Sequence, residues 1–372
     1  MRQVVIAGGG LSGLTAAIKL AQAGIEVLVV EKKQYPFHRV CGEYVSNEVL
    51  PFLKSIGADP AELNSAAITN FMLSSPSGNT LTASLDLGGF GISRYTLDNF
   101  LYKKATAAGV KFMLKTSVQD VAFSASEDIF TLSLSDGSTL CSKIVIGAYG
   151  KRATLDRQLQ RRFFLSRSPY IGVKYHLRLP FPKNLIALHN FKDGYAGISA
   201  IEDNKYCFCY LTTRQNLKQH GSIPAMEEKV LAKNPFLNQI FEKGEFLYQQ
   251  PEVINEISFA PKAAVEQHIL MSGDAAGMIT PLCGNGMAMA IHGAKLLSEQ
   301  LLHYFRNGQN RQHLEQAYRQ AWQQQFSRRL QTGRTIQHLF GSTILSEAAV
   351  GLLKRTPFAV NLLMKQTHGK PF

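Results

Sequence analysis

Three glycines and one carboxylate near the start of the chain have the types and spacing that bind phosphate and ribose. Gly8, Gly10 and Gly13 form a Gly-x-Gly-x-x-Gly pattern, and Glu31 follows Gly10 by 21 residues. Such glycines allow a tight turn, a close approach of the backbone to a pyrophosphate and close packing of a helix on a strand. A carboxylate at this spacing can accept hydrogen bonds from ribose hydroxyls. The combination predicts a dinucleotide site without distinguishing FAD from NAD.

A second cluster of small and polar residues, near the other end of the chain, decides between these cofactors. Gly273 and Asp274 follow a short apolar stretch, and a turn then leads into a helix expected over residues 287–303. Asp274 could hold a ribityl hydroxyl. The start of the helix, at residues 284–287, could direct N–H groups at the flavin edge that becomes negative on reduction. The pattern therefore favours FAD.

These residues need a strand–turn–helix–strand unit to position them, and the sequence predicts one. Residues 3–7 and 26–30 are apolar and β-branched, as in buried strands, and residues 11–23 have apolar side chains at helical spacing. The glycine turn then lies at the amino terminus of the helix, where free N–H groups and the helix dipole attract phosphate.

The two motifs, together with Arg94 at the start of an expected helix over 96–108, resemble the FAD-dependent hydroxylase superfamily typified by para-hydroxybenzoate hydroxylase. The resemblance covers about residues 1–305 as separate motifs. It implies FAD bound by Gly8, Gly10, Leu11, Ser12, Gly13, Glu31, Lys32, Arg39, Arg94, Gly273, Asp274, Pro281, Gly284, Asn285, Gly286 and Met287. No second Gly-x-Gly-x-x-Gly follows a strand and begins a helix, so electrons are expected from transiently docked NAD(P)H or from another reductant.

Residues 36–44, Pro-Phe-His-Arg-Val-Cys-Gly-Glu-Tyr, are more similar to the geranylgeranyl-reductase branch, which has a comparable basic-x-Cys-Gly stretch after its second strand. This resemblance implies catalytic roles for Cys41 and Glu43, and we expect Cys41 to affect turnover and not cofactor binding. An interpretation in which Cys41 is only a small buried side chain stays open. His38, Tyr44 and His292 are further acid–base candidates.

Two features depart from the usual superfamily pattern. Tyr149 stands in the stretch 146–152 where an Asp-Gly pair is usual, which weakens the transfer of an NADPH-handling role to this segment. The related flavin halogenases use a Trp-x-Trp-x-Ile-Pro signature, whereas this chain has one tryptophan, Trp322. Halogenation is therefore disfavoured.

Strand-like stretches dominate residues 165–260 and also flank a turn at 76–79, which predicts a second sheet. In one of these strands Lys174 and His176 alternate and would share a face, and aromatic residues such as Tyr195, Tyr206 and Phe208 could line an apolar cavity. We expect an α/β fold with a Rossmann-like FAD-binding domain, an inserted antiparallel β-sheet substrate domain and a C-terminal helical region. The expected domains are FAD-binding residues 1–65, 94–165 and 260–303, substrate-binding residues 66–93 and 166–259, and a basic helical region over 304–372.

Composition excludes several classes of protein. With 45% apolar and 18% charged residues, the chain is typical of a folded enzyme and unlike a disordered or fibrous protein. The longest apolar stretches have the length of a strand, well below the roughly 20 residues of a membrane-spanning helix. The five cysteines are scattered without a Cys-x-x-Cys pair. We expect no metal site and a cytoplasmic location.

The net charge of +13 is concentrated at the C-terminal end, where residues 303–372 carry +8. No nucleic-acid-binding motif accompanies this charge, so nucleic acid is not expected as a partner. Apolar residues recur every fourth position from Leu314 to Leu330, and the apolar stretches 336–345, 348–353 and 358–364 lie near cations. This region could close the substrate pocket as a lid, make peripheral contact with an anionic membrane, or expose a solvated basic face.

The function expected from these features is that of an FAD-dependent oxidoreductase acting with reduced flavin on a hydrophobic small molecule, such as an isoprenoid, a polyketide or an aromatic compound. Reduction of a carbon–carbon double bond is slightly preferred because of the residues around Cys41. Two alternatives stay open. One is a monooxygenase that hydroxylates an aromatic or polyketide substrate, and the other is a non-enzymatic carrier of prenyl groups with the same fold.

Overall fold

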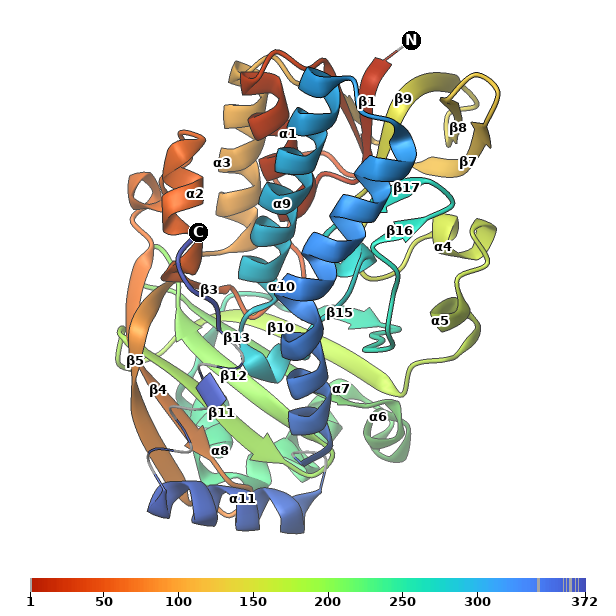
Figure 1. Ribbon diagram of the computed structural model, residues 1–372. Helices are drawn as coiled ribbons and strands as arrows, with labels where there is room; N and C mark the ends of the chain where they lie inside the picture. Colours follow the sequence, from red (N-terminus) through yellow and green to blue (C-terminus); the bar gives the residue numbers. More distant parts are fainter. Residues whose placement is uncertain are drawn as a thin grey trace.

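The computed structural model describes residues 2–339, 342–356, 358, 360, 363–364, 366 and 368–372, without the side chains of residues 338 and 339. Two β-sheets and their helices form the molecule (Figure 1), with the first sheet in the upper half of that view and the second below it. This arrangement confirms the expected α/β fold. Residues 340 and 341 of the expected stretch 336–345, residues 359, 361 and 362 of the stretch 358–364, and Lys365 lie outside the described residues.

The first sheet contains the strands that the glycine motif requires. Within the described residues it has eight strands: β1 (Arg2–Ala7), β2 (Val27–Glu31), β6 (Lys111–Leu114), β7 (Val118–Ser124), β8 (Ile129–Leu134), β9 (Thr139–Gly147), β16 (Val265–Glu266) and β17 (Ile269–Met271). The strand order is β16-β17-β9-β1-β2-β6, and β7 and β8 extend the sheet from β9. The central five strands are parallel, and long connections through other helices and strands join them.

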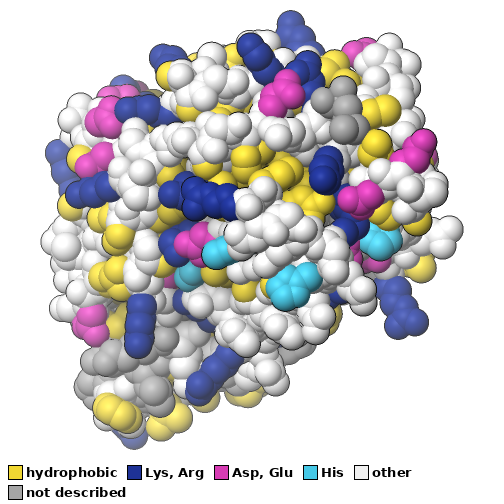
Figure 2. All heavy atoms as spheres, turned by 45° about the horizontal axis from the view of Figure 1, so that its top comes forward, with side chains coloured by type: hydrophobic (Ala, Val, Ile, Leu, Met, Phe, Trp, Pro, Cys, Tyr) yellow, Lys and Arg dark blue, Asp and Glu magenta, His cyan; other side chains and the backbone are white. Residues whose placement is uncertain are grey.

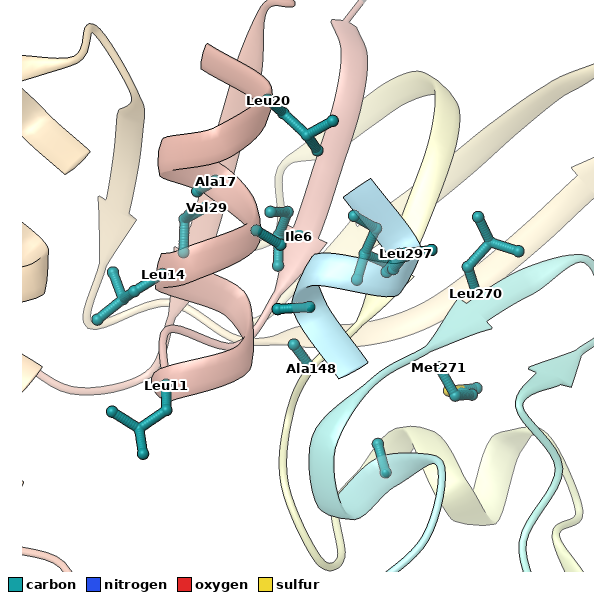
Figure 3. Close-up of a cluster of buried hydrophobic side chains, with 14 of the residues drawn as sticks. Ile6, Leu11, Leu14, Ala17, Leu20, Val29, Ala148, Leu270, Met271 and Leu297 are labelled. Carbon is teal, nitrogen blue, oxygen red and sulfur yellow. The ribbon is translucent and has the colours of Figure 1, made fainter. Parts of the chain in front are cut away.

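Three helices cover one face of this sheet: α1 (Leu11–Gln22), α3 (Arg94–Ala107) and α9 (Gly286–Asn307). Ala17 on α1 lies in one buried cluster with Ile6 of β1 and Val29 of β2 (Figure 3). Burial of each large aliphatic side chain in such a core contributes about 1.5–3 kcal/mol. Because α1 packs on the sheet and also contacts α3 and α9, most of its side chains are buried.

The second sheet has nine strands within the described residues: β3 (Tyr44–Ser46), β4 (Ala66–Ser74), β5 (Thr80–Gly91), β10 (Tyr170–Arg178), β11 (Leu185–Phe191), β12 (Gly194–Ala200), β13 (Tyr206–Thr213), β14 (Glu245–Phe246) and β15 (Glu252–Asn255). It is antiparallel except that β4 and β11 pair in parallel, an exception to the antiparallel sheet we expected. β4 belongs to the segment between β2 and β6, and β11 to the segment between β9 and β17. No hairpin joins the two strands, so their relative direction is not restricted to antiparallel.

The face of the second sheet that points away from the first is covered by α6 (Arg214–His220), α7 (Ile223–Lys229) and α8 (Pro235–Lys243). Tyr206 and Phe208 pack into this second core, so they do not line the cavity as the sequence suggested. Alternation along a strand places every second side chain on the opposite face. Short elements complete the chain: α2 (Leu50–Ser55), α4 (Thr154–Gln158), α5 (Arg162–Leu165), η1 (Asn47–Val49), η2 (Pro60–Leu63), η3 (Leu231–Lys233), η4 (Gly273–Ala275) and η5 (Pro281–Cys283).

The basic C-terminal region forms α10 (Arg311–Leu339) and α11 (Thr343–Arg355). The apolar stripe of α10 is buried against its own domain, where Trp322 packs closely on Gly293 of α9. Three of its arginines pair with acids: Arg311 with Asp128, Arg319 with Glu315 and Arg329 with Glu48.

Lysine and arginine side chains are dispersed over the face shown in Figure 2 and do not gather into one patch. Among the helices that the structure describes, none is both long and apolar enough to cross a membrane.

Candidate cofactor and substrate site

A cavity of about 940 Å³ is lined by residues of both sheets. One end is formed by the turn between β1 and α1, the end of β2 and the start of α9. The other end is formed by β4, β5, β11 and β12, together with residues of the C-terminal region. The volume lies within the range of about 300–1,000 Å³ that is common for ligand pockets.

The three glycines of the motif have different environments. A Cβ atom at Gly8 would lie 2.5 Å from the carbonyl oxygen of Ala148, and one at Gly13 would lie 2.1 Å from the carbonyl oxygen of Gly8. Both positions therefore require glycine for packing. At Gly10 a Cβ atom would meet only the Arg94 guanidinium, at 3.8 Å. Gly10 thus leaves open space at the cavity wall, which fits the close approach of a pyrophosphate.

The Glu31 carboxylate ends β2 at the cavity wall and is nearly fully buried. It accepts hydrogen bonds from the backbone N–H groups of Gly9 at 2.8 Å and Lys33 at 3.0 Å, and the Arg39 guanidinium lies 3.4 Å away. A carboxylate offers about four acceptor positions, so it keeps capacity for the hydroxyls of a ribose. This is the geometry that the sequence motif predicts.

The second motif is joined to the first, although the two are about 260 residues apart. The hydroxyl of Ser12 on α1 donates a hydrogen bond of 2.6 Å to the hydroxyl of Ser272, directly before Gly273. Gly273 has a φ of +63°, and a Cβ atom there would approach Ser12 to 3.1 Å. Asp274 therefore lies at the cavity wall beside the glycine turn. Burial raises the pKa of Asp274, and Lys262 and other nearby cations oppose that rise.

The turn before α9 contributes Pro281, Gly284, Gly286 and Met287 to the cavity wall. Asn285 does not line it. Its side chain is buried beside Glu48, with which it forms a hydrogen bond. Like Gly13, Asn285 has a structural role here, whereas the other predicted cofactor residues surround the cavity.

Asp98 on α3 holds the two predicted arginines at the cavity. Arg94 donates two hydrogen bonds to the Asp98 carboxylate, at 2.8 and 2.7 Å, and Arg39 donates a third at 3.1 Å. Asp98 is buried, and both arginines line the cavity. Sequence reasoning missed Asp98, although its position four residues after Arg94 on a helix was an available signal.

The predicted residue Glu43 is fully buried in a cluster of charged groups. Its carboxylate oxygens contact the Lys174 ammonium at 2.5 Å and the His176 imidazole Nε2 at 2.6 Å, and one of them accepts the backbone N–H of Arg94 at 2.8 Å. Burial alone would raise the pKa of Glu43, but Lys174 and His176 outweigh it and lower the pKa to about 2. Lys174 and His176 share a face of β10, as their alternate spacing predicted.

This cluster continues through hydrogen bonds to His38. The Tyr248 hydroxyl lies 2.7 Å from Nδ1 of His176 and 3.2 Å from Nδ1 of His38. Cys207 completes a group of potential metal ligands with Glu43 and His176. Its thiol, however, donates a hydrogen bond to the carbonyl oxygen of Cys41 at 3.2 Å. Because hydrogen bonds and the Lys174 ammonium already satisfy these atoms, we interpret the group as a polar network and not as a metal centre.

Cys41 lies at the cavity wall where the two halves meet. Burial raises the pKa of its thiol, and the Arg94 guanidinium, which hydrogen-bonds the Cys41 side chain, acts in the opposite direction. The thiol is therefore protonated at neutral pH and has a cation beside it. His292, another acid–base candidate, lies outside the cavity and stacks on Phe372.

The hydroxyl of Tyr149, which replaces the usual acid, donates a hydrogen bond of 2.9 Å to Asp156. Asp156 also pairs with the buried Arg161 at 2.9 Å. Two lysines near this segment, Lys151 and Lys262, were not singled out by the sequence. Burial lowers the pKa of each to about 8, and Lys151 lines the cofactor end of the cavity.

The other end of the cavity is mainly aliphatic. Its wall includes Phe71, Leu73, Leu81, Leu85, Ile186, Leu188, Ile254, Ile257, Met278, Leu282, Ile336, Leu353, Val360 and Met364. An aliphatic wall of this kind binds apolar ligand surface through the hydrophobic effect. The cavity therefore has a polar end that fits FAD and an apolar end that fits a hydrophobic molecule.

Proteins similar to this chain include a receptor, a reductase and a halogenase. The chain is 23% identical to conditioned medium factor receptor 1 of Dictyostelium discoideum, over 95% of this chain and 73% of the relative. It is 22% identical to digeranylgeranylglycerophospholipid reductase 1 of Methanococcoides burtonii, over 91% of this chain and 84% of the relative. The crystal structure of CmlS, a flavin-dependent halogenase, has the same fold, with a TM-score of 0.77 at 20% identity, covering 92% of this chain and 65% of that one.

The similarity that assigns the family extends across both sheets. Residues 1–330 match a family described as FAD binding domain. This range includes the glycine turn, Glu31, Asp274 and the strands of the second sheet, and the match confirms FAD as the cofactor of an FAD-dependent oxidoreductase. Because most of the chain is matched, the protein belongs to the FAD binding domain family.

Proposed function

We propose that this protein reduces a carbon–carbon double bond of a hydrophobic, isoprenoid-like molecule. The observation that carries the proposal is the aliphatic end of the cavity, which continues from the polar cofactor end without a separating wall. When bound and reduced, FAD supplies a hydride equivalent to an acceptor. A long apolar molecule at the aliphatic end would bring a double bond to the junction of the two halves.

Cys41 is the group that we assign to proton transfer. Reduction of a double bond adds a hydride to one carbon and a proton to its neighbour, and the raised pKa of the Cys41 thiol keeps a proton available on Sγ. The Arg94 guanidinium can stabilise the thiolate that remains until water returns the proton. Glu43 is a positioning residue, because its carboxylate is occupied by Lys174 and His176 and fixes the chain beside Cys41.

The sequence of residues 36–44 and the similarity to a Methanococcoides burtonii digeranylgeranylglycerophospholipid reductase support the geranylgeranyl-reductase-like branch. NAD(P)H would supply electrons by docking transiently, since the sequence has no second Gly-x-Gly-x-x-Gly motif between a strand and a helix. Halogenation is not proposed, because a single tryptophan cannot form a Trp-x-Trp signature and Trp322 is buried in the core. The carrier alternative assumed a protein without FAD, and the family assignment removes it.

Hydroxylation of an aromatic or polyketide molecule is the second candidate function. It is favoured by the aromatic rings of Tyr44, Phe71 and Tyr195 on the cavity wall, which can stack on a flat substrate. Both candidates use the same cofactor site and differ in whether oxygen is consumed.

The experiment that separates them starts from the purified yellow protein, reduced without oxygen. Isoprenoid, polyketide and aromatic molecules are then added, and flavin reoxidation and product mass are measured with and without oxygen. Anaerobic reoxidation by an isoprenoid, with a product that gains two hydrogens per bond, is the expected result. A product that gains one oxygen atom, formed only in air, would replace this proposal with hydroxylation.

A further inference from the structure

Helix α11 exposes apolar side chains on the face that does not pack on the molecule. Ile344 is 80% exposed, Leu345 48% and Leu352 65%, and Phe358, just beyond the helix, is 81% exposed. Of the eight large hydrophobic side chains that are exposed among the described residues, these are four. Figure 1 shows α11 across the lower end of the molecule, beneath β4 and β5.

The opposite face of α11 is firmly attached. Val350 and Ser346 are buried, and the Glu347 carboxylate accepts hydrogen bonds from the backbone N–H of Ser77, at 2.6 Å, and from its hydroxyl, at 2.9 Å. Leu353 lines the apolar end of the cavity. A surface helix normally has one apolar and one polar face, whereas α11 has large apolar side chains on its exposed face as well.

The fully exposed charged side chains of α11 have one sign. Lys354 and Arg355 are exposed at the end of the helix. Glu347, the only acid in α11, is turned toward the turn at Ser77. Apolar side chains together with cations are the composition of helices that lie in the interface of an anionic membrane. A partner protein with an acidic apolar groove would need the same features, but it would not explain why the helix also forms a wall of the cavity.

We propose that the exposed face of α11 docks on an anionic lipid bilayer, and that a hydrophobic substrate passes from the bilayer into the cavity beside this helix. The proposal deepens the proposed function and rests on it for the substrate. In this arrangement α11 would lie between the lipid and the apolar end of the cavity. Leu352 and Leu353 are consecutive, and the first is exposed while the second lines the cavity.

The test is flotation of the FAD-loaded full-length protein with vesicles of phosphatidylcholine alone or with phosphatidylglycerol. Wild-type protein is expected to float with the anionic vesicles at low salt, and less at high salt because salt screens surface charge. Each surface cation contributes about 1 kcal/mol, so Lys354→Gln with Arg355→Gln should lower partitioning roughly 25-fold. Ile344→Ser with Leu352→Ser should lower partitioning to both kinds of vesicle. Leu165→Ser is the matched control, since Leu165 is 82% exposed in α5.

Three outcomes would overturn the proposal. Wild-type protein could ignore anionic vesicles at low salt, or the α11 variants could float as well as the control. The variants could also convert an oligomer into a monomer in sedimentation analysis, which would identify the face as an interface between copies of the chain. Flotation is measured without turnover, so a failure of the reductase proposal leaves vesicle binding unchanged, and a failure of the membrane proposal leaves reduction of a detergent-dissolved substrate unchanged.

Discussion

The two ends of the cavity are built in different ways. The cofactor end uses a glycine turn, the free N–H groups of helix termini and a few side chains such as Glu31 and Asp274. The substrate end uses side chains from distant strands and from the C-terminal region. A backbone site depends on a short stretch of sequence, whereas a side-chain wall depends on how remote segments pack. The first kind of site therefore leaves a motif in the sequence, and the second does not.

Cys41 lies where the two ends meet, and it gives the largest expected effect. If its thiol supplies the proton, Cys41→Ala should lower turnover roughly 10²- to 10⁴-fold, as expected for loss of a general acid. The flavin spectrum and FAD content should stay unchanged, because Cys41 is not among the residues expected to bind FAD. Steady-state rates and absorbance spectra measure the two effects.

Cys209 provides the control for this change, since it also lines the cavity and has no guanidinium partner among the interactions that the structure records. Cys209→Ala should affect turnover far less than Cys41→Ala. Wild-type turnover by Cys41→Ala would show that the residue is a small packing side chain.

The buried ion cluster of Glu43, Lys174 and His176 is polar, unlike the aliphatic wall of the substrate end. Lys174→Met would remove the ammonium that pairs with the buried Glu43 carboxylate, and breaking such a buried pair costs about 3–5 kcal/mol of unfolding free energy. Urea unfolding of the FAD-loaded protein measures the loss. The double variant with Glu43→Gln should recover much of it, because the charge that caused the penalty is gone.

Arg178→Met supplies a matched change on the same strand, where the ion pair with Glu245 is exposed. This variant should lose less than about 1 kcal/mol. If both variants lost the same unfolding free energy, the ion pairs around Glu43 would be no more stabilising than the exposed pair of Arg178, and the cluster would have to be solvated.

More of the cofactor end than of the substrate end could be predicted from the sequence, and the reason is physical. The βαβ unit, Gly8 to Gly13, Glu31 and Asp274 were predictable because local spacing determines their geometry. Lys174 and His176 could be placed on one strand face, but their partner Glu43 is about 130 residues away and came only from a family resemblance. No local rule relates such segments.

Side-chain burial in the second sheet was equally hard to predict. A strand with two buried faces gives no alternation of polar and apolar residues, so the sequence could not tell whether Tyr206 and Phe208 face the cavity or the core under α6, α7 and α8. The parallel pairing of β4 and β11 depends on the path of the chain through the first sheet.

Two carboxylates test the cofactor end directly. Glu31→Ala and Asp274→Ala each remove acceptors at the polar end of the cavity, and a hydrogen bond to a charged group contributes about 1.5–3 kcal/mol. FAD affinity should therefore fall roughly 10- to 150-fold in each variant. Equilibrium dialysis with absorbance measures the retained flavin. Stoichiometric FAD in both variants after dialysis would contradict a site built from both motifs.

Lys151 gives the smallest expected effect and tests whether charge contributes to the cofactor end. Burial lowers its pKa to about 8, while Asp274 and Glu256 oppose the shift. Below this pKa the ammonium adds positive charge to a site for a diphosphate, and above it the lysine is neutral. FAD affinity should thus fall several-fold as the pH rises from about 7 to about 9, and by no more than roughly tenfold per pH unit. Flavin fluorescence measures the free cofactor across this range. Lys151→Gln should bind FAD several-fold more weakly at neutral pH and show a shallower profile, because Lys262, whose pKa is also about 8, is then the nearby lysine that still loses its charge. A wild-type profile that is already flat would mean that backbone groups and hydrogen bonds, and not this ammonium, hold the cofactor.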